Sequence, residues 1–278
     1  MNGVLTIAQL TWLEARRRRI VLAALLCGVA FLTVFAIAVY FISHSSRALG
    51  PPSLLQRQIE LQVVSLAGLY AVNFLIVALA IMLPVDTLSG EIASGVIQTL
   101  VAKPIRRRDI VLGKWLVYWL MIGLYIVLMA GGVALSMRLV TGFAQQHMPP
   151  AIALMWLEAT VLLCVTFAGG VTFSTITNGI IAFAFYVLAF IGGWIEQIGV
   201  MLGNASARYI GTAISLISPA DAIWHLALHL LQPPVMSQTL VTPFSPASVP
   251  SAAMVWWSAG FAAAALGLAL REFQKRAL

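Results

Sequence analysis

Six long runs of apolar residues constrain what this chain can fold into. They cover residues 20–42, 61–85, 110–137, 151–177, 179–202 and 251–270. Each run is about as long as a helix that crosses the hydrocarbon core of a bilayer, which takes roughly 20 residues. Lipid cannot satisfy backbone polar groups, so a spanning segment is a helix or part of a closed barrel. Continuous apolar runs, in place of alternating ones, favour helices. The sequence therefore predicts an all-α polytopic protein with six transmembrane helices in a single domain over residues 1–278.

The composition excludes a soluble globule. Only 9% of the residues are charged and 61% are hydrophobic, whereas a soluble domain carries roughly 25% charged residues. The first apolar run is longer than the roughly 7–15 residues of a signal-peptide core, so we expect it to be retained as a span.

The basic residues predict the direction of the spans. Twelve of the sixteen Lys and Arg fall in three regions: 16–19, 103–114 and 271–276. With six spans these regions share one side of the membrane, and the positive-inside rule makes that side cytoplasmic. Both termini and the 86–109 loop are thus expected in the cytoplasm. Topology is a sufficient reason for the basic clusters, so we expect no nucleic-acid partner.

Two helices are expected outside the spans. Val4, Leu5, Ala8 and Trp12 recur at helical spacing and predict an interfacial helix that lies on lipid of the inner leaflet. On the outer side, Ser218 resembles an N-cap that is followed by a proline at the first helical position. A short amphipathic helix from there to about Gln232 is the expected result.

The cytoplasmic 86–109 loop carries the most specific pattern. Ile92, Val96, Thr99 and Leu100 can form one face of a short helix, which Pro104 ends. A helix across the ends of two spans can dock on a partner protein and pass movement into both spans. The alternative from the residues alone is a solvated loop.

The same loop resembles the signature loop of type-2 ATP-binding-cassette (ABC) transporter permeases. The matching positions, in register and without a gap, are Glu91, Gly95, Leu100, Pro104, Arg107, Ile110, Gly113 and Lys114. Val96 and Val101 depart from the usual Thr and Leu. The resemblance implies a coupling helix between spans two and three that seats on a separate ATPase subunit.

Further expectations come with that resemblance. The working unit is expected to contain two ABC ATPase copies and a second permease copy, as a homodimer, in a bacterial cytoplasmic (inner) membrane. Export is the expected direction, and a periplasmic accessory protein is a further candidate partner. The chain contains no G-x-x-x-x-G-K-[ST] sequence, which cradles nucleotide phosphates. We therefore expect no enzyme activity and no cofactor in this chain, with ATP and Mg bound by the partner.

Polar residues inside the spans are candidates for the translocation path. Glu158 and Asn73 are the two candidates, because an ionisable or amide group inside the membrane is costly and therefore often functional. The alternatives are an ion pair of Glu158 with Arg138 or Arg208, and a simple interhelix hydrogen bond for Asn73. Two other functions stay open: a gradient-driven secondary transporter with Glu158 as ion carrier, and a membrane scaffold of an enzyme complex.

His225 and His229 are spaced i, i+4, which can hold a metal ion. No third ligand accompanies them at a useful spacing, so no metal site is predicted.

Overall fold

A computed structural model describes residues 3–45, 53–95, 106–232 and 249–276. Six of its helices are long and apolar enough to cross a membrane, which confirms the predicted all-α fold with six spans. They are α2 (Arg19–Ser45), α3 (Leu54–Met82), α6 (Arg107–Thr141), α7 (Met148–Thr172), α8 (Thr175–Met201) and α12 (Ala253–Lys275).

The bounds of two spans differ from the expected ones for local reasons. α3 begins seven residues before 61, because the side chain of Ser53 accepts a hydrogen bond from Gln56 N at 3.2 Å and caps the first turn. α7 ends at Thr172 and not near 177. There Ser174 caps the start of α8, where its hydroxyl accepts from Thr177 N.

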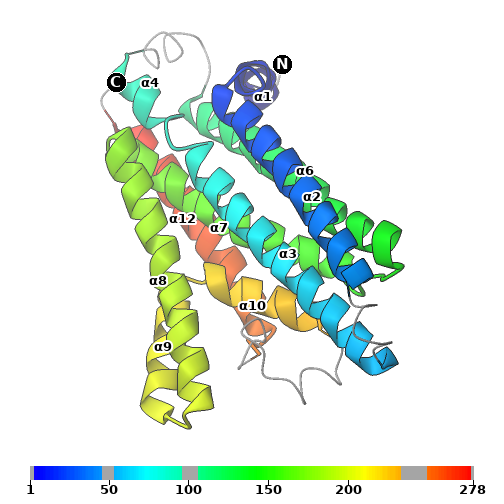
Figure 1. The fold of residues 1–278 in the computed structure, drawn as a ribbon. Coiled ribbons are helices and arrows are strands. Elements are labelled where there is room, and N and C mark those ends of the chain that lie inside the picture. The colour runs from blue at the N-terminus through cyan, green and yellow to red at the C-terminus, as the bar shows by residue number, and fades with distance from the viewer. Residues whose placement is uncertain (1–2, 46–52, 96–105, 233–248, 277–278) are drawn as a thin grey trace.

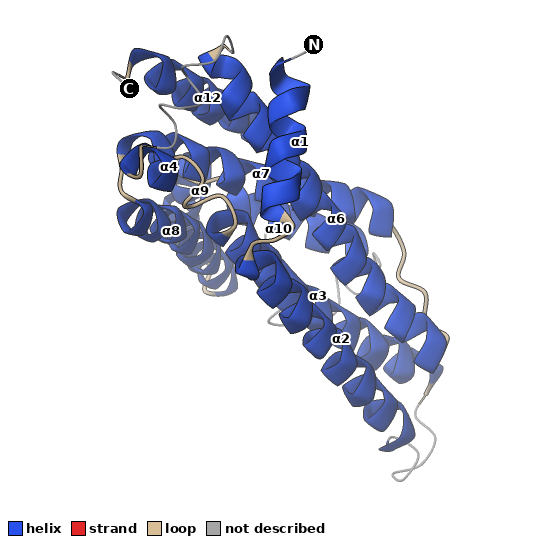
Figure 2. Cartoon of the chain, turned by 90° about the horizontal axis from the view of Figure 1, so that it is seen from above, coloured by secondary structure: helices blue, strands red, loops and turns tan. Residues whose placement is uncertain are grey.

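Both termini lie at the end of the bundle where the short helix α4 (Ser89–Ala93) lies (Figure 1). The N-terminal helix α1 (Gly3–Ala15) runs across this end and packs on α6, as the view from above also shows (Figure 2). Its buried side faces the protein through Ile7, Ala8, Thr11 and Ala15, whereas Trp12 is exposed. The helix is thus formed as expected, and its contact with lipid stays a prediction.

The opposite end carries two helices, α9 (Ala205–Ile217) and α10 (Ala220–Leu231), bent by 108° at the break between them. The expected helix to about Gln232 is α10, but its predicted cap is wrong. Ser218 ends α9, and its hydroxyl donates to Phe185 O at 2.9 Å on α8. Pro219 takes the N-cap position. α10 is also mostly buried, and its Trp224 is only 1% exposed.

One helix was expected on this side, from Ser218 to about Gln232, and α9 was not predicted. This helix folds back along α8 at very short range: a Cβ at Gly211 would lie 2.8 Å from Gly192 O, and one at Gly199 would lie 2.9 Å from Arg208 N. Asn204 caps it by accepting from Ala207 N at 3.2 Å. Small residues along both helices, Gly192 and Gly199 on α8 with Ala207 and Gly211 on α9, are the signal that could have predicted the hairpin.

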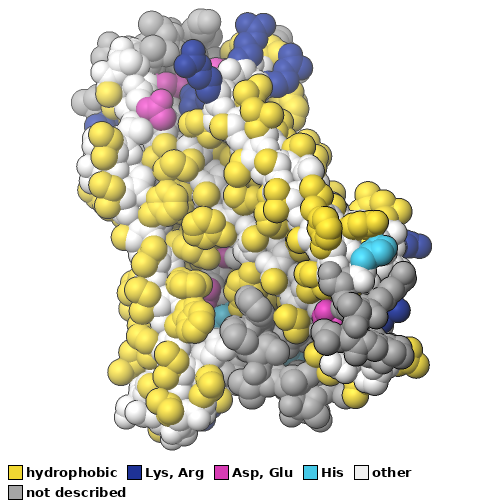
Figure 3. Space-filling model, viewed as in Figure 1, with side chains coloured by type: hydrophobic (Ala, Val, Ile, Leu, Met, Phe, Trp, Pro, Cys, Tyr) yellow, Lys and Arg dark blue, Asp and Glu magenta, His cyan; other side chains and the backbone are white. Residues whose placement is uncertain are grey.

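The buried core runs along α3, α6 and α7, which are flanked by the other spans. Hydrophobic side chains also cover the flank of the bundle that Figure 3 displays, whereas Lys and Arg gather mainly at the end with α1 and α4. An apolar flank with one basic end is the surface expected of a bundle surrounded by lipid.

Candidate functional site

A buried ion pair joins the loop motif to the third span. Glu91 on α4 accepts from the ammonium of Lys114 on α6, and these side chains are 15% and 4% exposed. The first and last residues of the motif are thus in direct contact, although 22 residues separate them in sequence. The pair fixes α4 on the end of α6.

Other motif residues hold the same end together. Arg107, at the start of α6, donates to Gln274 O at 3.3 Å and to Arg276 O at 2.7 Å, and so ties α6 to the C-terminal helix. Gly95 follows α4 with φ +73°, a left-handed conformation that favours glycine. Leu100 and Pro104, with the rest of 96–105, lie outside the described residues.

Gly113 lets α1 cross α6 closely. A Cβ at this position would lie 2.8 Å from Val4 O and 2.8 Å from the Cβ of Ile7. A backbone oxygen cannot move aside without shifting the helix, so the glycine of the motif is needed for the seat of α1.

We predict that Gly113→Ala loosens α1 and lowers stability by about 1–3 kcal/mol, the usual cost of overpacking. The readouts are the melting temperature in detergent and the rate of tryptic cleavage at Arg16–Arg19. Gly131→Ala is the matched control, because it is in the same helix and its added methyl meets open space. Equal behaviour of the two variants would show that α1 is not seated on Gly113.

Further hydrogen bonds, made by residues that the sequence did not single out, join helices at the same end of the bundle. Thr87 donates to the hydroxyl of Tyr118 on α6 at 2.8 Å. Thr175 at the start of α8 donates to Asp86 at 3.0 Å. Asn178 donates to Val85 O at 3.3 Å and to Thr166 O at 3.0 Å, and so joins α8 to the end of α3 and to α7.

We call residues 85–91, with Lys114, Tyr118, Thr175 and Asn178, the coupling junction. These residues join α4 and the segment before it to α6, α7 and α8 through hydrogen bonds and one ion pair.

The two candidate path residues meet inside the bundle. Asn73 on α3 donates its amide to Oε1 of Glu158 on α7 at 3.2 Å, and both side chains are buried. Oε2 of Glu158 and the side-chain amide oxygen Oδ1 of Asn73 have no hydrogen-bond partner among the described residues. None of the ion pairs among the described residues includes Glu158. The alternative of an ion pair with Arg138 or Arg208 is therefore not observed among them.

A second buried carboxylate lies on α10. Asp221 is 3% exposed, and its Oδ2 lies 3.6 Å from Nδ1 of His225. Gly193 on α8 packs against it so closely that a larger side chain there would overlap Asp221. Sequence reasoning overlooked this i, i+4 acidic partner of His225. No group of three His, Cys, Asp or Glu suited to a metal occurs in the described part of the chain.

Comparison with known proteins gives one family. The sequence model of the family described as "ABC-2 family transporter protein" matches residues 5–278, nearly the whole chain. The chain belongs to this ABC-2 family. A search among curated proteins gave no match.

Membership in the ABC-2 family makes the chain the membrane component of a transporter, a multi-pass permease that is generally not catalytic. It also implies association with ABC ATPases. The coupling junction and the pair of Asn73 and Glu158 can now be considered as parts of a permease.

Proposed function

We propose that this permease is the transmembrane subunit of an ATP-driven exporter, coupled to separate ATPases through the 86–109 loop. The observation that carries the proposal is the buried pair of Glu91 and Lys114, which fixes α4 to α6 within a motif that resembles the family's coupling loop. Burying two charges costs free energy that only a well-formed contact between them offsets. A loop exposed to solvent is therefore not expected to contain such a pair.

In this proposal the working unit has two permease copies and two ATPase copies in a bacterial inner membrane, with both termini cytoplasmic. The two-fold arrangement is the commonest closed symmetry of oligomers. The basic residues support the orientation, since Arg16–Arg19 and Arg271 lie at the same end of the bundle as α4.

The coupling junction gives the proposal a mechanical route. An ATPase that moves α4 also moves the ends of α3 and α6, because Thr87 bonds to Tyr118 and Glu91 to Lys114. The α7–α8 turn follows through Thr175 and Asp86. Four spans therefore tilt together, and a path beside Asn73 and Glu158 opens to alternate sides.

The test uses the permease with its co-purified ATPase in inverted membrane vesicles. Untargeted mass spectrometry identifies the compounds that enter the vesicles only when ATP, the ATPase and this chain are all present. We expect ATP-dependent uptake that vanadate stops, since uptake into inverted vesicles corresponds to export from the cell.

Two outcomes contradict the proposal. Flux driven by an ion gradient without any ATPase would identify a secondary transporter, for which the buried carboxyl of Glu158 would be the carrier. A complex that hydrolyses ATP but moves no compound that depends on this chain would favour a membrane scaffold.

A further inference from the structure

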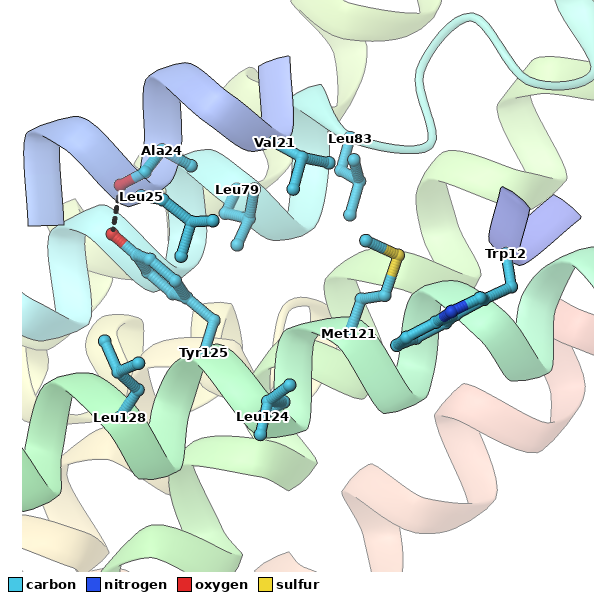
Figure 4. A pocket seen from close by; sticks show the side chains of 10 residues that line it. All are labelled: Trp12, Val21, Ala24, Leu25, Leu79, Leu83, Met121, Leu124, Tyr125 and Leu128. Atoms are coloured by element: carbon cyan, nitrogen blue, oxygen red, sulfur yellow. Dashed lines mark hydrogen bonds between the residues drawn. The ribbon is translucent and has the colours of Figure 1, made fainter. Parts of the chain in front are cut away.

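An apolar cavity of about 110 Å³ lies between four helices near the end that carries α1. Figure 4 labels its lining: Trp12 comes from α1, Val21 from α2, Leu79 from α3, and Met121, Leu124 and Tyr125 from α6. Apart from Trp12 and Tyr125, the lining residues that Figure 4 labels carry only hydrocarbon or thioether side chains.

The chemistry of the lining excludes a polar occupant. The hydroxyl of Tyr125 already donates to Ala24 O at 3.2 Å, the bond drawn in Figure 4. A trapped water needs two to four polar partners, which these side chains do not supply. The cavity therefore fits a hydrocarbon group.

The cavity opens on a lipid-facing flank. Leu25, Leu124 and Leu128 line it and are 44%, 64% and 43% exposed. Exposed leucines in spanning helices contact acyl chains, so the lipid phase has direct access to the cavity.

Positive charge lies at the same end. Arg16, Arg17 and Arg19 are exposed and lie in the chain between two lining residues, Trp12 and Val21. The guanidinium of Arg18 is instead held by Glu14 at 2.6 Å. Because the spans end here, we expect these charges at the level of the lipid headgroups.

We propose that this cavity binds one acyl chain of an anionic phospholipid, whose phosphate is held by the exposed arginines of residues 16–19. The lipid fills the space between α1, α2, α3 and α6, and so stabilises the seat of α1 beside the coupling junction. The site is independent of ATPase binding and of the transported compound.

The experiment measures quenching of Trp12 fluorescence by phospholipids brominated on the acyl chain. The full-length permease is reconstituted with brominated phosphatidylglycerol or brominated phosphatidylcholine, each diluted in the same unlabelled lipid. The signal of Trp12 is the difference between the wild type and Trp12→Phe. We expect stronger quenching by the anionic lipid.

Two variants separate the parts of the site. Ala24→Phe fills the cavity and should at least halve quenching by both lipids, whereas Leu22→Phe, on an exposed face of the same helix, should not change it. Replacement of Arg16, Arg17 and Arg19 together by Gln should reduce the preference for the anionic lipid by about fivefold or more, the factor that one cationic residue near an anionic surface supplies.

Glycerol phosphate and native mass spectrometry supply further tests. Soluble glycerol phosphate should not reduce the quenching, because it lacks the acyl chain. Native mass spectrometry of the wild type should retain one phosphatidylglycerol in preference to phosphatidylcholine, a measurement that needs no variant to fold. Equal quenching by the two lipids, or a preference that survives loss of the three arginines, would overturn the proposal.

Discussion

Lys114→Met is expected to abolish ATP-driven flux while the permease still inserts in the membrane. The substitution leaves the carboxylate of Glu91 buried and unpaired beside α6. Breaking a buried pair in this way costs about 3–5 kcal/mol. A cost of 3 kcal/mol lowers the equilibrium constant for α4 in place on α6 by about a hundredfold. The measurements are flux in inverted vesicles and the amount of ATPase that co-purifies.

The chain offers a matched control for this prediction. Lys275 and Glu272 form an exposed ion pair, 4.0 Å apart with side chains 60% and 46% exposed, at the same end of the bundle. Exposed pairs contribute about 0–1 kcal/mol, so Lys275→Met should leave flux nearly unchanged. The double variant Glu91→Met, Lys114→Met removes both charges and should restore stability. If Lys114→Met transports like Lys275→Met, the buried pair has no part in coupling.

The second large effect concerns the pair inside the membrane. Asn73→Leu alone removes the donor that the described residues give to the buried carboxyl of Glu158, and should lower stability by about 1–3 kcal/mol. The double variant Asn73→Leu, Glu158→Leu replaces both partners by apolar groups and should recover that stability. We nevertheless expect the double variant to lose at least tenfold in ATP-driven flux, because both proposed path residues are gone.

Stability and flux together decide between a path and a structural bond. Glu158→Gln keeps the shape and an amide hydrogen bond, so its flux reports the effect of the charge alone. Thr166→Val is the control on the same helix, because the hydroxyl of Thr166 only donates back to Leu162 O. A double variant that is stable and transports at the wild-type rate would make the pair a structural contact only.

The six spans could be predicted from the sequence because a bilayer imposes a length and a composition that few other segments share. Span ends were less predictable, since single caps decide them: Ser53 lengthens α3 and Ser174 separates α7 from α8. The hairpin of α8 and α9 was missed because its signal, small residues that pack together, is divided between two separate segments.

The candidate site was predictable only as a list of residues. Spacing placed Glu91 and Lys114 in one motif, but their contact depends on how α4 folds back on α6. Asn73 and Glu158 were selected separately, each for its cost in the membrane, and only the packing of α3 on α7 brings them together. Asp86, Thr87 and Asn178 carry no sequence signal, because short polar side chains beside a span are common.

The most direct test of the account is a crosslink between α4 and the ATPase. Ser94 is exposed next to α4, so Ser94→Cys in a background with Cys27→Ala and Cys164→Ala can carry a benzophenone label. Leu202→Cys, exposed at the far end of the bundle, is the control. The account predicts that the label at position 94 crosslinks to the ATPase in the intact complex and that the label at 202 does not. Absence of the crosslink from position 94 in a complex that contains the ATPase, or an equal crosslink from 202, would contradict it.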